Sequence, residues 1–469
     1  MTADILLWPA HEIAAAVQAR RVSARAVTEA AIARIEAGNP RLGAFTDLTF
    51  ARARAEADAV DTTVRQGAAP PLAGVPYGAK NLFDIAGVVT RAGSKINRDN
   101  RPARADATLV GRMKDAGAIL LGGLNMGEYA YDFTGENAHD GASLNPHDPT
   151  RMSGGSSGGS GTAVASGMVA AALCSDTNGS IRVPASFCGL FGLKPTLGRL
   201  SRAGAFPFCA SLDHLGPLAR SARDLALLFD VLQGDDPADP MQVHRPPIAA
   251  LAAIDDGVSG LRIAVADDYF RRNGMPEAFA AVDKVAAALG ATRSVAVPEA
   301  ARARAAAYVI TTAEAAALHL DRLRTRAADF DPDVRDRLLS GAMVPAAWLI
   351  RAQRFRAWFR DAMRRVFEDV DILLAPATPF HALPSGTKTV TLDGVAMPAR
   401  PNIGIFTQPI SFIGLPVVAV PVWLDGASLP VGVQVIAPAW REDLALRVAY
   451  HLERAGVAAA PVARQLEAA

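Results

Sequence analysis

Two segments rich in serine and glycine are the part of this chain best suited to chemistry. The first, GGSSGGSG, contains Ser156, and the second, DTNGSIR, contains Ser180. The apolar segment Ala163–Cys174 separates them, and no acidic or basic residue lies between Met152 and Ser175. Serines held among glycines beside an apolar element indicate a site where hydroxyls and backbone amides meet a substrate.

A serine hydroxyl is a poor nucleophile without a base, and Lys80 is the best candidate for that base. It lies in LAGVPYGAKNLFDIAG, and no charged residue occurs between Arg65 and Lys80. Burial disfavours the charged form of an amine, so a lysine in an apolar segment can be neutral. Lys194, within GLKPT, is the next candidate.

Other interpretations of the glycine-rich run are weaker. GSSGG fits the G-x-S-x-G nucleophile elbow, but the acid and histidine would then be Asp213 and His214, which are adjacent in the sequence. A flexible linker would lack the apolar flank, and a phosphate-binding loop would need the lysine of its motif. We therefore favour a catalytic loop.

Composition sets the broad class of the protein. The chain has 469 residues, 50% of them hydrophobic and 20% charged, and a formal net charge of +1, which predicts no attraction to nucleic acid or acidic lipid. It contains neither a long apolar run nor a signal-like N-terminus, so we expect no membrane span. The 3 cysteines and 8 histidines lack metal-site spacing. We expect buried, reduced cysteines, no metal, and a cytoplasmic location.

Strand-like and helical segments alternate along most of the chain, which predicts an α/β fold within one domain, residues 1–469. We expect a helical region at 1–70, a core with the candidate catalytic residues at 71–232, a helical and βαβ-like insertion at 233–370, and C-terminal strands and a helix at 371–469. The clearest elements are helices at Ala10–Arg21, Ser23–Ala37, Ser221–Leu232, Ala303–Ala328, Ala346–Phe367 and Glu442–Ala455, strands at Ala118–Gly122, Asp371–Ala375, Val417–Val420 and Val431–Ile436, and the βαβ-like unit Leu261–Val297.

One basic run, Arg351–Arg365, stands out from an otherwise mixed charge pattern. Its apolar residues recur at helical spacing, so we interpret it as a solvated amphipathic helix.

Long segments of the chain resemble the amidase signature family. The resemblance rests on PYGAKN around Lys80, GGSSGGS at 154–160 and DTNGSIRVPASFCGLFGLKPT at 176–196. It continues in GLNMGEYA, SLDHLGPLARS, DILLAPATP, GLPVVAVPV and LPVGVQVI. It implies the amidase signature fold, a large mixed β-sheet covered by helices on both faces, and no cofactor.

The resemblance also implies a Ser-cisSer-Lys triad. The nucleophile falls on Ser180, the bridging serine with a cis peptide bond before it falls on Ser156, and the base falls on Lys80. The oxyanion hole falls on the backbone N–H groups of Thr177, Asn178, Gly179 and Ser180.

Substrate contacts are expected from three polar residues, Tyr131, Asn178 and Arg182. Asn178 replaces the glycine that is commoner at this position in the family, and it tolerates left-handed backbone angles. Its amide either contacts the substrate or only serves the turn. Arg182 either contacts the substrate or forms a structural ion pair with an acid such as Asp176.

The segment DTNGSIRVPAS, followed later by RAGAFPFCASLDHLGPLARS, is most similar to the branch of the family that contains the 1-carboxybiuret hydrolase of cyanuric acid breakdown. This implies an amidohydrolase that cleaves the C–N bond of a small polar urea-like or carbamoyl substrate through an acyl-enzyme and releases ammonia. It also implies a homodimer or heterotetramer with a small helical accessory subunit, without nucleic acid or membrane. Specificity is expected in Ala301–Ile350 and Phe380–Thr407.

Three alternatives remain open. The first is the glutamine-hydrolysing A-type component of the glutamyl-tRNA amidotransferase, which would share the whole triad. The second is a general amidase of other small amides. The third, a non-catalytic binding relative, is disfavoured because all three triad positions are filled.

Overall fold

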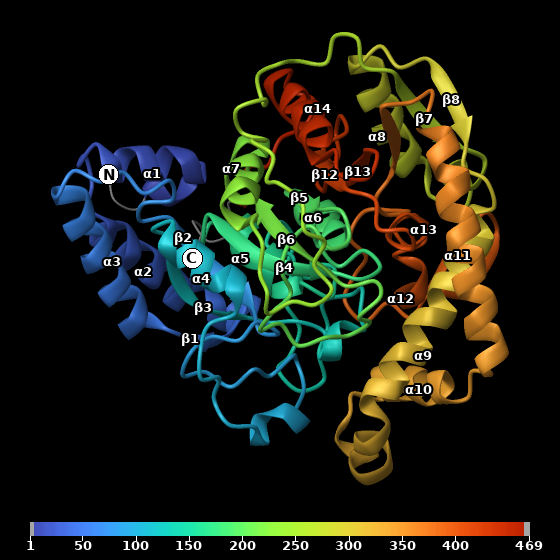
Figure 1. Cartoon of the computed structure of the whole chain (residues 1–469), viewed down its shortest axis with the longest axis horizontal. Helices are drawn as coiled ribbons and strands as arrows, with labels where there is room; N and C mark the ends of the chain where they lie inside the picture. Colours follow the sequence, from blue (N-terminus) through green and yellow to red (C-terminus); the bar gives the residue numbers. More distant parts are fainter. Residues whose placement is uncertain (1–3, 464–469) are drawn as a thin grey trace.

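The computed structural model describes residues 4–463 (Figure 1). Its strands are β1 (Phe45–Leu48), β2 (Pro76–Lys80), β3 (Ile119–Leu124), β4 (Ala171–Asp176), β5 (Phe191–Lys194), β6 (His214–Ala219), β7 (Ile263–Asp267), β8 (Arg293–Ala296), β9 (Ile372–Pro376), β10 (Thr389–Leu392), β11 (Val395–Pro398), β12 (Val417–Val422) and β13 (Val431–Ile436). Its α-helices are α1 (Ala10–Gln18), α2 (Ala24–Leu42), α3 (Phe50–Arg65), α4 (Thr108–Asp115), α5 (Gly158–Ala165), α6 (Arg182–Cys188), α7 (Ala222–Leu232), α8 (Pro276–Ala288), α9 (Ala300–Arg326), α10 (Pro332–Ala342), α11 (Ala346–Val366), α12 (Ala399–Asn402), α13 (Gln408–Ser411) and α14 (Glu442–Arg454).

Eleven of the strands form one mixed sheet, in the order β1-β3-β2-β4-β6-β5-β12-β13-β9-β7-β8. Strands β3, β2 and β4 are parallel, as are β9, β7 and β8, and the pairs between these two groups are antiparallel. Helices cover both faces of the sheet, so the expected α/β fold with a large mixed sheet is confirmed.

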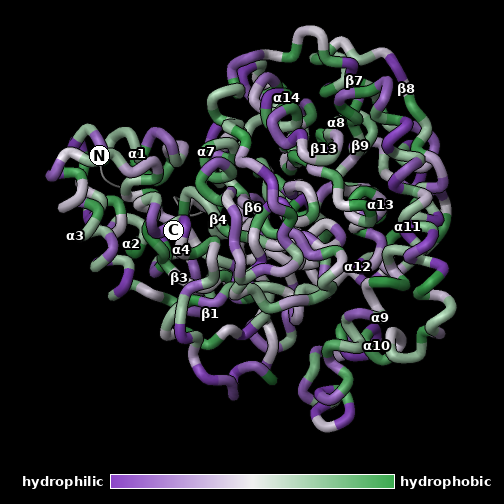
Figure 2. Tube along the Cα trace, in the orientation of Figure 1, coloured by the Kyte–Doolittle hydropathy of each residue, from purple (hydrophilic) through white to green (hydrophobic). Residues whose placement is uncertain are grey.

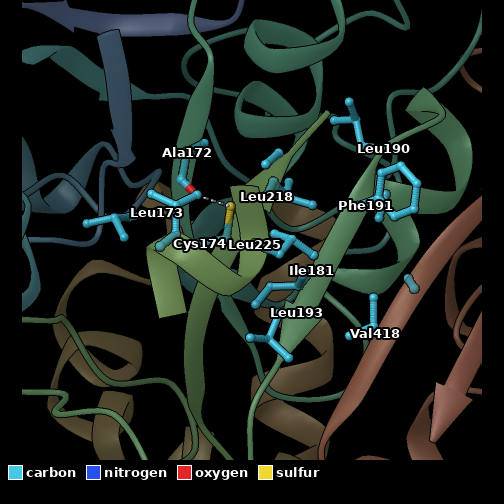
Figure 3. Close-up of a cluster of buried hydrophobic side chains, with 14 of the residues drawn as sticks. Ala172, Leu173, Cys174, Ile181, Leu190, Phe191, Leu193, Leu218, Leu225 and Val418 are labelled. Carbon is cyan, nitrogen blue, oxygen red and sulfur yellow. Dashed lines mark hydrogen bonds between the residues drawn. The ribbon is translucent and has the colours of Figure 1, made fainter. Parts of the chain in front are cut away.

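The central strands are apolar along their whole length, because they are covered on both faces. β12 (VVAVPV) and β13 (VGVQVI) are buried at every position. Figure 3 shows the core beside them, where Leu173, Phe191, Leu218, Leu225 and Val418 lie together. The outer helices α9 and α11 instead carry hydrophilic and hydrophobic stretches in turn (Figure 2), as amphipathic helices do.

The N-terminal region is helical as expected, with one exception. Ser23 caps α2 and accepts a hydrogen bond from the Ala26 N–H at 3.0 Å. The four-residue strand β1, which the sequence pattern did not reveal, pairs antiparallel with β3 at the edge of the sheet. Its residues are FTDL, half of them polar, so no strand-like alternation marks it.

The βαβ-like unit is confirmed as β7, α8 and β8, with the two strands parallel. Because β7 also pairs with β9, this unit extends the main sheet. Strands from all four regions of the chain therefore join one sheet.

The β10–β11 hairpin was not foreseen, since it is short and mostly exposed. Within residues 4–463, no helix is both long enough and apolar enough to span a bilayer.

Candidate active site

The sheet brings Lys80 against two serines. β2 and β4 are adjacent parallel strands, so their carboxyl ends lie at the same edge of the sheet. Lys80 ends β2, and Ser175 is the residue before the last of β4. The Lys80 Nζ lies 2.7 Å from the Ser156 Oγ and 2.8 Å from the Ser175 Oγ. The lysine is completely buried, so these hydroxyls are its immediate environment.

Burial lowers the pKa of Lys80 from its ordinary 10.5 to about 7. The nearby side chains of Cys174, Asp176, Asp213 and Asp132 act in the opposite direction, but desolvation is larger. A large fraction of the amine is therefore neutral near pH 7. A neutral amine can accept a proton from the Ser156 hydroxyl, which is the chemistry required of a general base.

Ser156 lies in the loop that leads into α5, and the peptide bond between Gly155 and Ser156 is cis. The backbone here fits closely around Asp132. A Cβ on Gly155 would lie 2.3 Å from the Asp132 Oδ2, so only glycine can occupy this position. The Ser156 carbonyl accepts a hydrogen bond from the Gly127 N–H at 3.1 Å, which fixes the loop from the other side.

The segment from Thr177 to Ser180 connects β4 to α6, and its first residue is anchored by a buried acid. The Thr177 Oγ1 donates to the Asp213 Oδ1 at 2.6 Å. The other Asp213 oxygen accepts the N–H groups of Phe208 and Cys209 at 2.8 and 2.9 Å. Asp213 therefore positions the loop and does not pair with His214, whose Nδ1 lies 3.0 Å from the Asp176 carbonyl.

The middle of the loop is fixed by two threonines. The Thr407 Oγ1 donates to the Asn178 carbonyl at 2.6 Å, and the Asn178 Nδ2 donates to the Thr311 Oγ1 at 3.0 Å. Gly179 has φ = +146°, and a Cβ there would lie 2.3 Å from the Thr407 Oγ1, so glycine is required. Across the described chain, the backbone N–H groups of Asn178, Gly179 and Ser180 have no bonded acceptor. They remain available to an oxyanion.

Ser180 lies in a narrow cavity that encloses about 10 Å³, room for about one water molecule. A second cavity of about 350 Å³ reaches Ser175, and Ala130, Thr177 and Phe208 line both. Side chains must therefore move to admit a substrate. The first cavity is lined by Ala130, Tyr131, Asp132, Phe133, Thr177, Asn178, Ser180, Phe208, Tyr308, Thr311, Arg337 and Gln408.

Tyr131 and Asn178, two of the residues expected to contact a substrate, line this cavity. Within residues 4–463 the buried Asn178 Oδ1 has no hydrogen-bond partner, and the buried Tyr131 hydroxyl lies near the Tyr308 hydroxyl and the Arg337 guanidinium without a hydrogen bond of normal geometry. The Arg337 guanidinium lies 3.5 Å from the centre of the Tyr131 ring and donates to the Tyr131 carbonyl at 2.8 Å. The cavity thus presents an unsatisfied amide oxygen and a loosely held phenol beside one cation.

Arg182 does not reach the cavity, and the prediction that it contacts the substrate is wrong. Its guanidinium binds both oxygens of Asp176 at 2.9 Å, the Gln434 Oε1 at 2.7 Å, the Thr407 carbonyl at 3.1 Å, and the Ser411 Oγ. A guanidinium has five N–H donors, and these acceptors use all of them. Burial raises the pKa of Asp176, but the Arg182 guanidinium more than offsets this and holds it below its usual range. The structure therefore contains the alternative, a structural ion pair between Arg182 and Asp176.

Sequence reasoning missed three residues of the site: Ser175, Asp213 and Arg337. Ser175 carried a signal, since it directly precedes the DTNGS motif in a segment free of charge. Asp213 was noted only as a neighbour of His214. Arg337 falls inside the segment 301–350 that was expected to determine specificity, but nothing in the local sequence distinguishes it from the surrounding arginines.

Comparison with known proteins identifies the family of this chain. The family model described as Amidase matches residues 26–446. AtzE, the 1-carboxybiuret hydrolase subunit of Pseudomonas sp. (strain ADP), is 54% identical over 449 residues, which cover 95% of this chain and 98% of that protein. The A-type component of the glutamyl-tRNA(Gln) amidotransferase of Roseiflexus sp. (strain RS-1) is 38% identical, over 90% of this chain and 91% of that protein.

Solved structures give the same relationship. One of them, described as a vestigial protein complex that reveals the evolutionary origins of an s-triazine catabolic enzyme, superposes with a TM-score of 0.95 at 53% identity, covering 96% of this chain and 99% of that one. The A-type component of the glutamyl-tRNA(Gln) amidotransferase of Thermotoga maritima superposes with a TM-score of 0.78 at 29% identity, covering 99% and 98%. The chain belongs to the amidase family and is an amide-hydrolysing enzyme.

The depressed pKa of Lys80 predicts an acidic limb in the pH–rate profile. Protonation removes the lone pair of the amine, so kcat/KM should rise as the pH increases through about 7 and should level off above it. The measurement is ammonia release from biuret between pH 5.5 and 9. A limb near pH 10, as for a solvated lysine, would contradict the assignment, and Lys80→Met should abolish the activity at every pH.

The structural role of Arg182 predicts a loss of stability. Arg182→Met leaves the Asp176 carboxylate buried without its partner, which should lower the free energy of unfolding by about 3–5 kcal/mol. Urea denaturation measures this, and Asp176→Asn in the same chain should restore part of the loss. Arg324→Met, which removes an exposed ion pair on α9, should cost less than about 1 kcal/mol. A raised KM in Arg182→Met, with an unchanged free energy of unfolding, would instead show that Arg182 contacts the substrate.

Proposed function

We propose that this chain hydrolyses 1-carboxybiuret or a closely related carboxylated urea and releases ammonia. The observation that carries the mechanism is the buried Lys80 amine, with its lowered pKa, 2.7 Å from the Ser156 Oγ, in a loop that packs against Asp132 of the cavity that holds Ser180. The choice of substrate is supported by the 54% identity with a 1-carboxybiuret hydrolase subunit over nearly the whole of both chains.

In the proposed reaction, neutral Lys80 takes the proton of Ser156 as Ser156 takes the proton of Ser180. The Ser180 Oγ then attacks the carbonyl carbon. The negative charge that develops on the carbonyl oxygen is stabilised by the N–H groups of the loop from Thr177 to Ser180, each contributing about 3 kcal/mol. The relay returns a proton to the leaving nitrogen, the C–N bond breaks, and ammonia departs. Water, activated by the same relay, hydrolyses the acyl-enzyme.

We propose that Arg337 binds the carboxylate of the substrate. It is the one arginine or lysine that lines the Ser180 cavity within residues 4–463, and it contacts the Tyr131 carbonyl and lies near the Tyr131 hydroxyl, with no acid within 4 Å there. Asp132, which also lines the cavity, is already compensated by Arg400 at 3.1 Å and by the Gly135 N–H at 2.7 Å. A substrate carboxylate would therefore meet an uncompensated guanidinium, which can bind it with two parallel hydrogen bonds.

We also propose a cytoplasmic location and a small helical accessory subunit. Helix α11 and the turn before it expose Met343, Trp348, Ile350 and Trp358, each between 45% and 81% exposed. A contact with another protein would bury these apolar side chains. All three cysteines are free and buried, as in proteins of a reducing compartment. A homodimer or heterotetramer built on such a subunit is part of the same proposal.

The substrate proposal predicts a clear order of activities. Ammonia release from freshly prepared 1-carboxybiuret should exceed release from glutamine by about 100-fold or more in kcat/KM, which corresponds to about 2.7 kcal/mol. Preferred turnover of glutamine would favour the amidotransferase-type glutaminase. Ser180→Ala should reduce kcat by about 1000-fold or more. Ser166→Ala, which removes a buried serine hydroxyl whose one bonded acceptor within residues 4–463 is the Ala163 carbonyl, is the matched control and should retain activity.

The role of Arg337 predicts discrimination between two substrates that differ by one carboxylate. Arg337→Gln should lower kcat/KM for 1-carboxybiuret by about 10- to 100-fold, because hydrogen bonds to a charged group are lost. Activity on biuret, which lacks the carboxylate, should hardly change. Arg335→Gln, a half-buried neighbour on α10 that does not line the cavity, serves as the control. Equal losses on both substrates would show that Arg337 only supports the structure of the cavity.

A further inference from the structure

The basic run of α11 forms one wall of a large hollow far larger than the Ser180 cavity. The hollow encloses about 770 Å³. Gln353, Arg356, Arg360 and Arg364 line it from α11, at the three- and four-residue spacing that places side chains on one face of a helix. The opposite wall consists of Arg245 and three loops: residues 196–197 after β5, 413–415 before β12, and 438–440 after β13.

The hollow has a strong excess of positive charge. Four arginines line it, and no aspartate or glutamate does, as far as the described residues show. Asp361 compensates only Arg364, at 3.2 Å. Neither Arg245 nor Arg360 has an acidic partner within 4 Å in residues 4–463. Arg356, which is half-buried, donates to the Ser211 carbonyl at 2.7 Å, and Glu314, which accepts from Ser211, acts on its charge.

The arrangement differs from a solvated basic helix in two ways. The Arg245 guanidinium is held 4.5 Å from the centre of the Trp440 ring, so it is positioned across the hollow from α11. Arg356, Arg360 and Arg364 follow one another at four-residue intervals, where like charges repel. By contrast, Arg354 and Arg365 of the same helix do not line the hollow. Arginines that converge from two sides match the geometry of a bound oxyanion, because guanidinium groups bind phosphate and carboxylate through paired N–H donors.

We propose that this hollow is a binding site for a small multivalent oxyanion, a molecule with two or more phosphate or carboxylate groups. Its volume lies in the range of small-molecule sites. It shares no lining residue with the cavity at Ser180, so the site is separate from the catalytic centre. The proposal stands independently of the substrate assigned above.

Isothermal titration calorimetry with sodium tripolyphosphate and with sodium citrate, at constant ionic strength in chloride, tests this site. We expect a Kd below about 1 mM for at least one probe. Tighter binding of tripolyphosphate identifies a phosphoryl ligand, and tighter binding of citrate identifies a polycarboxylate. The double variant Arg360→Gln/Arg364→Gln should weaken binding by about tenfold or more, since two charge-assisted contacts are lost. Its amide hydrolysis should equal that of the parent.

The matched control removes the same charge from the same helix outside the hollow. Arg354→Gln/Arg365→Gln should change the Kd less than about twofold, because screened surface charges contribute little to binding at a distance. An equal loss in both double variants would mean general attraction to a basic helix and would overturn the site. So would no binding of either probe, or much tighter binding of an octaglutamate peptide, which would indicate a polypeptide partner.

Discussion

The structure depends on one constraint, the burial of the Lys80 amine between two serine hydroxyls. An ammonium group surrounded by protein loses its hydration, so its neutral form becomes accessible near pH 7. The parallel pair β2 and β4 creates this environment, because it brings Lys80 and Ser175 to the same edge of the sheet. A lysine at a looser or wetter position would be charged and could not take a proton from Ser156. The apolar core of the sheet is thus a condition of the chemistry.

Around this centre, buried polar groups fix the backbone that would receive the substrate. The Asp176–Arg182 pair lies beneath the loop that carries Ser180, and Asp213 and Thr407 hold the loop from its two sides. Buried ion pairs contribute little net stability, but breaking one leaves an expensive unpaired charge. The network therefore restricts the loop to one conformation and keeps its N–H groups directed away from internal acceptors, which is the preorganisation that amide hydrolysis needs.

Much of the fold could be predicted from the sequence, because long apolar strands and amphipathic helices carry periodic signals. The βαβ unit, the helices α7 and α14 and the strands β12 and β13 follow such patterns. The strand β1 and the β10–β11 hairpin do not, because they are short and partly polar, and tertiary pairing decides their conformation. Arg182 shows the same limit within the site. An arginine next to a catalytic motif is compatible with a substrate contact or an ion pair, and only the five acceptors around it decide between them.

The sequence by itself determined the class of chemistry. Serines among glycines and a lysine in an uncharged segment predict a serine nucleophile with a lysine base, and the resemblance to the amidase signature family adds the bridging serine. The tertiary structure alone decided which groups face the substrate and which serve the scaffold. Arg337, from a helix more than 150 positions away in the chain, lines the same cavity as Ser180, whereas Arg182, two positions away, points into the core. The reason is physical: solvation and contact depend on distance in space, and a folded sheet makes that distance independent of separation along the chain.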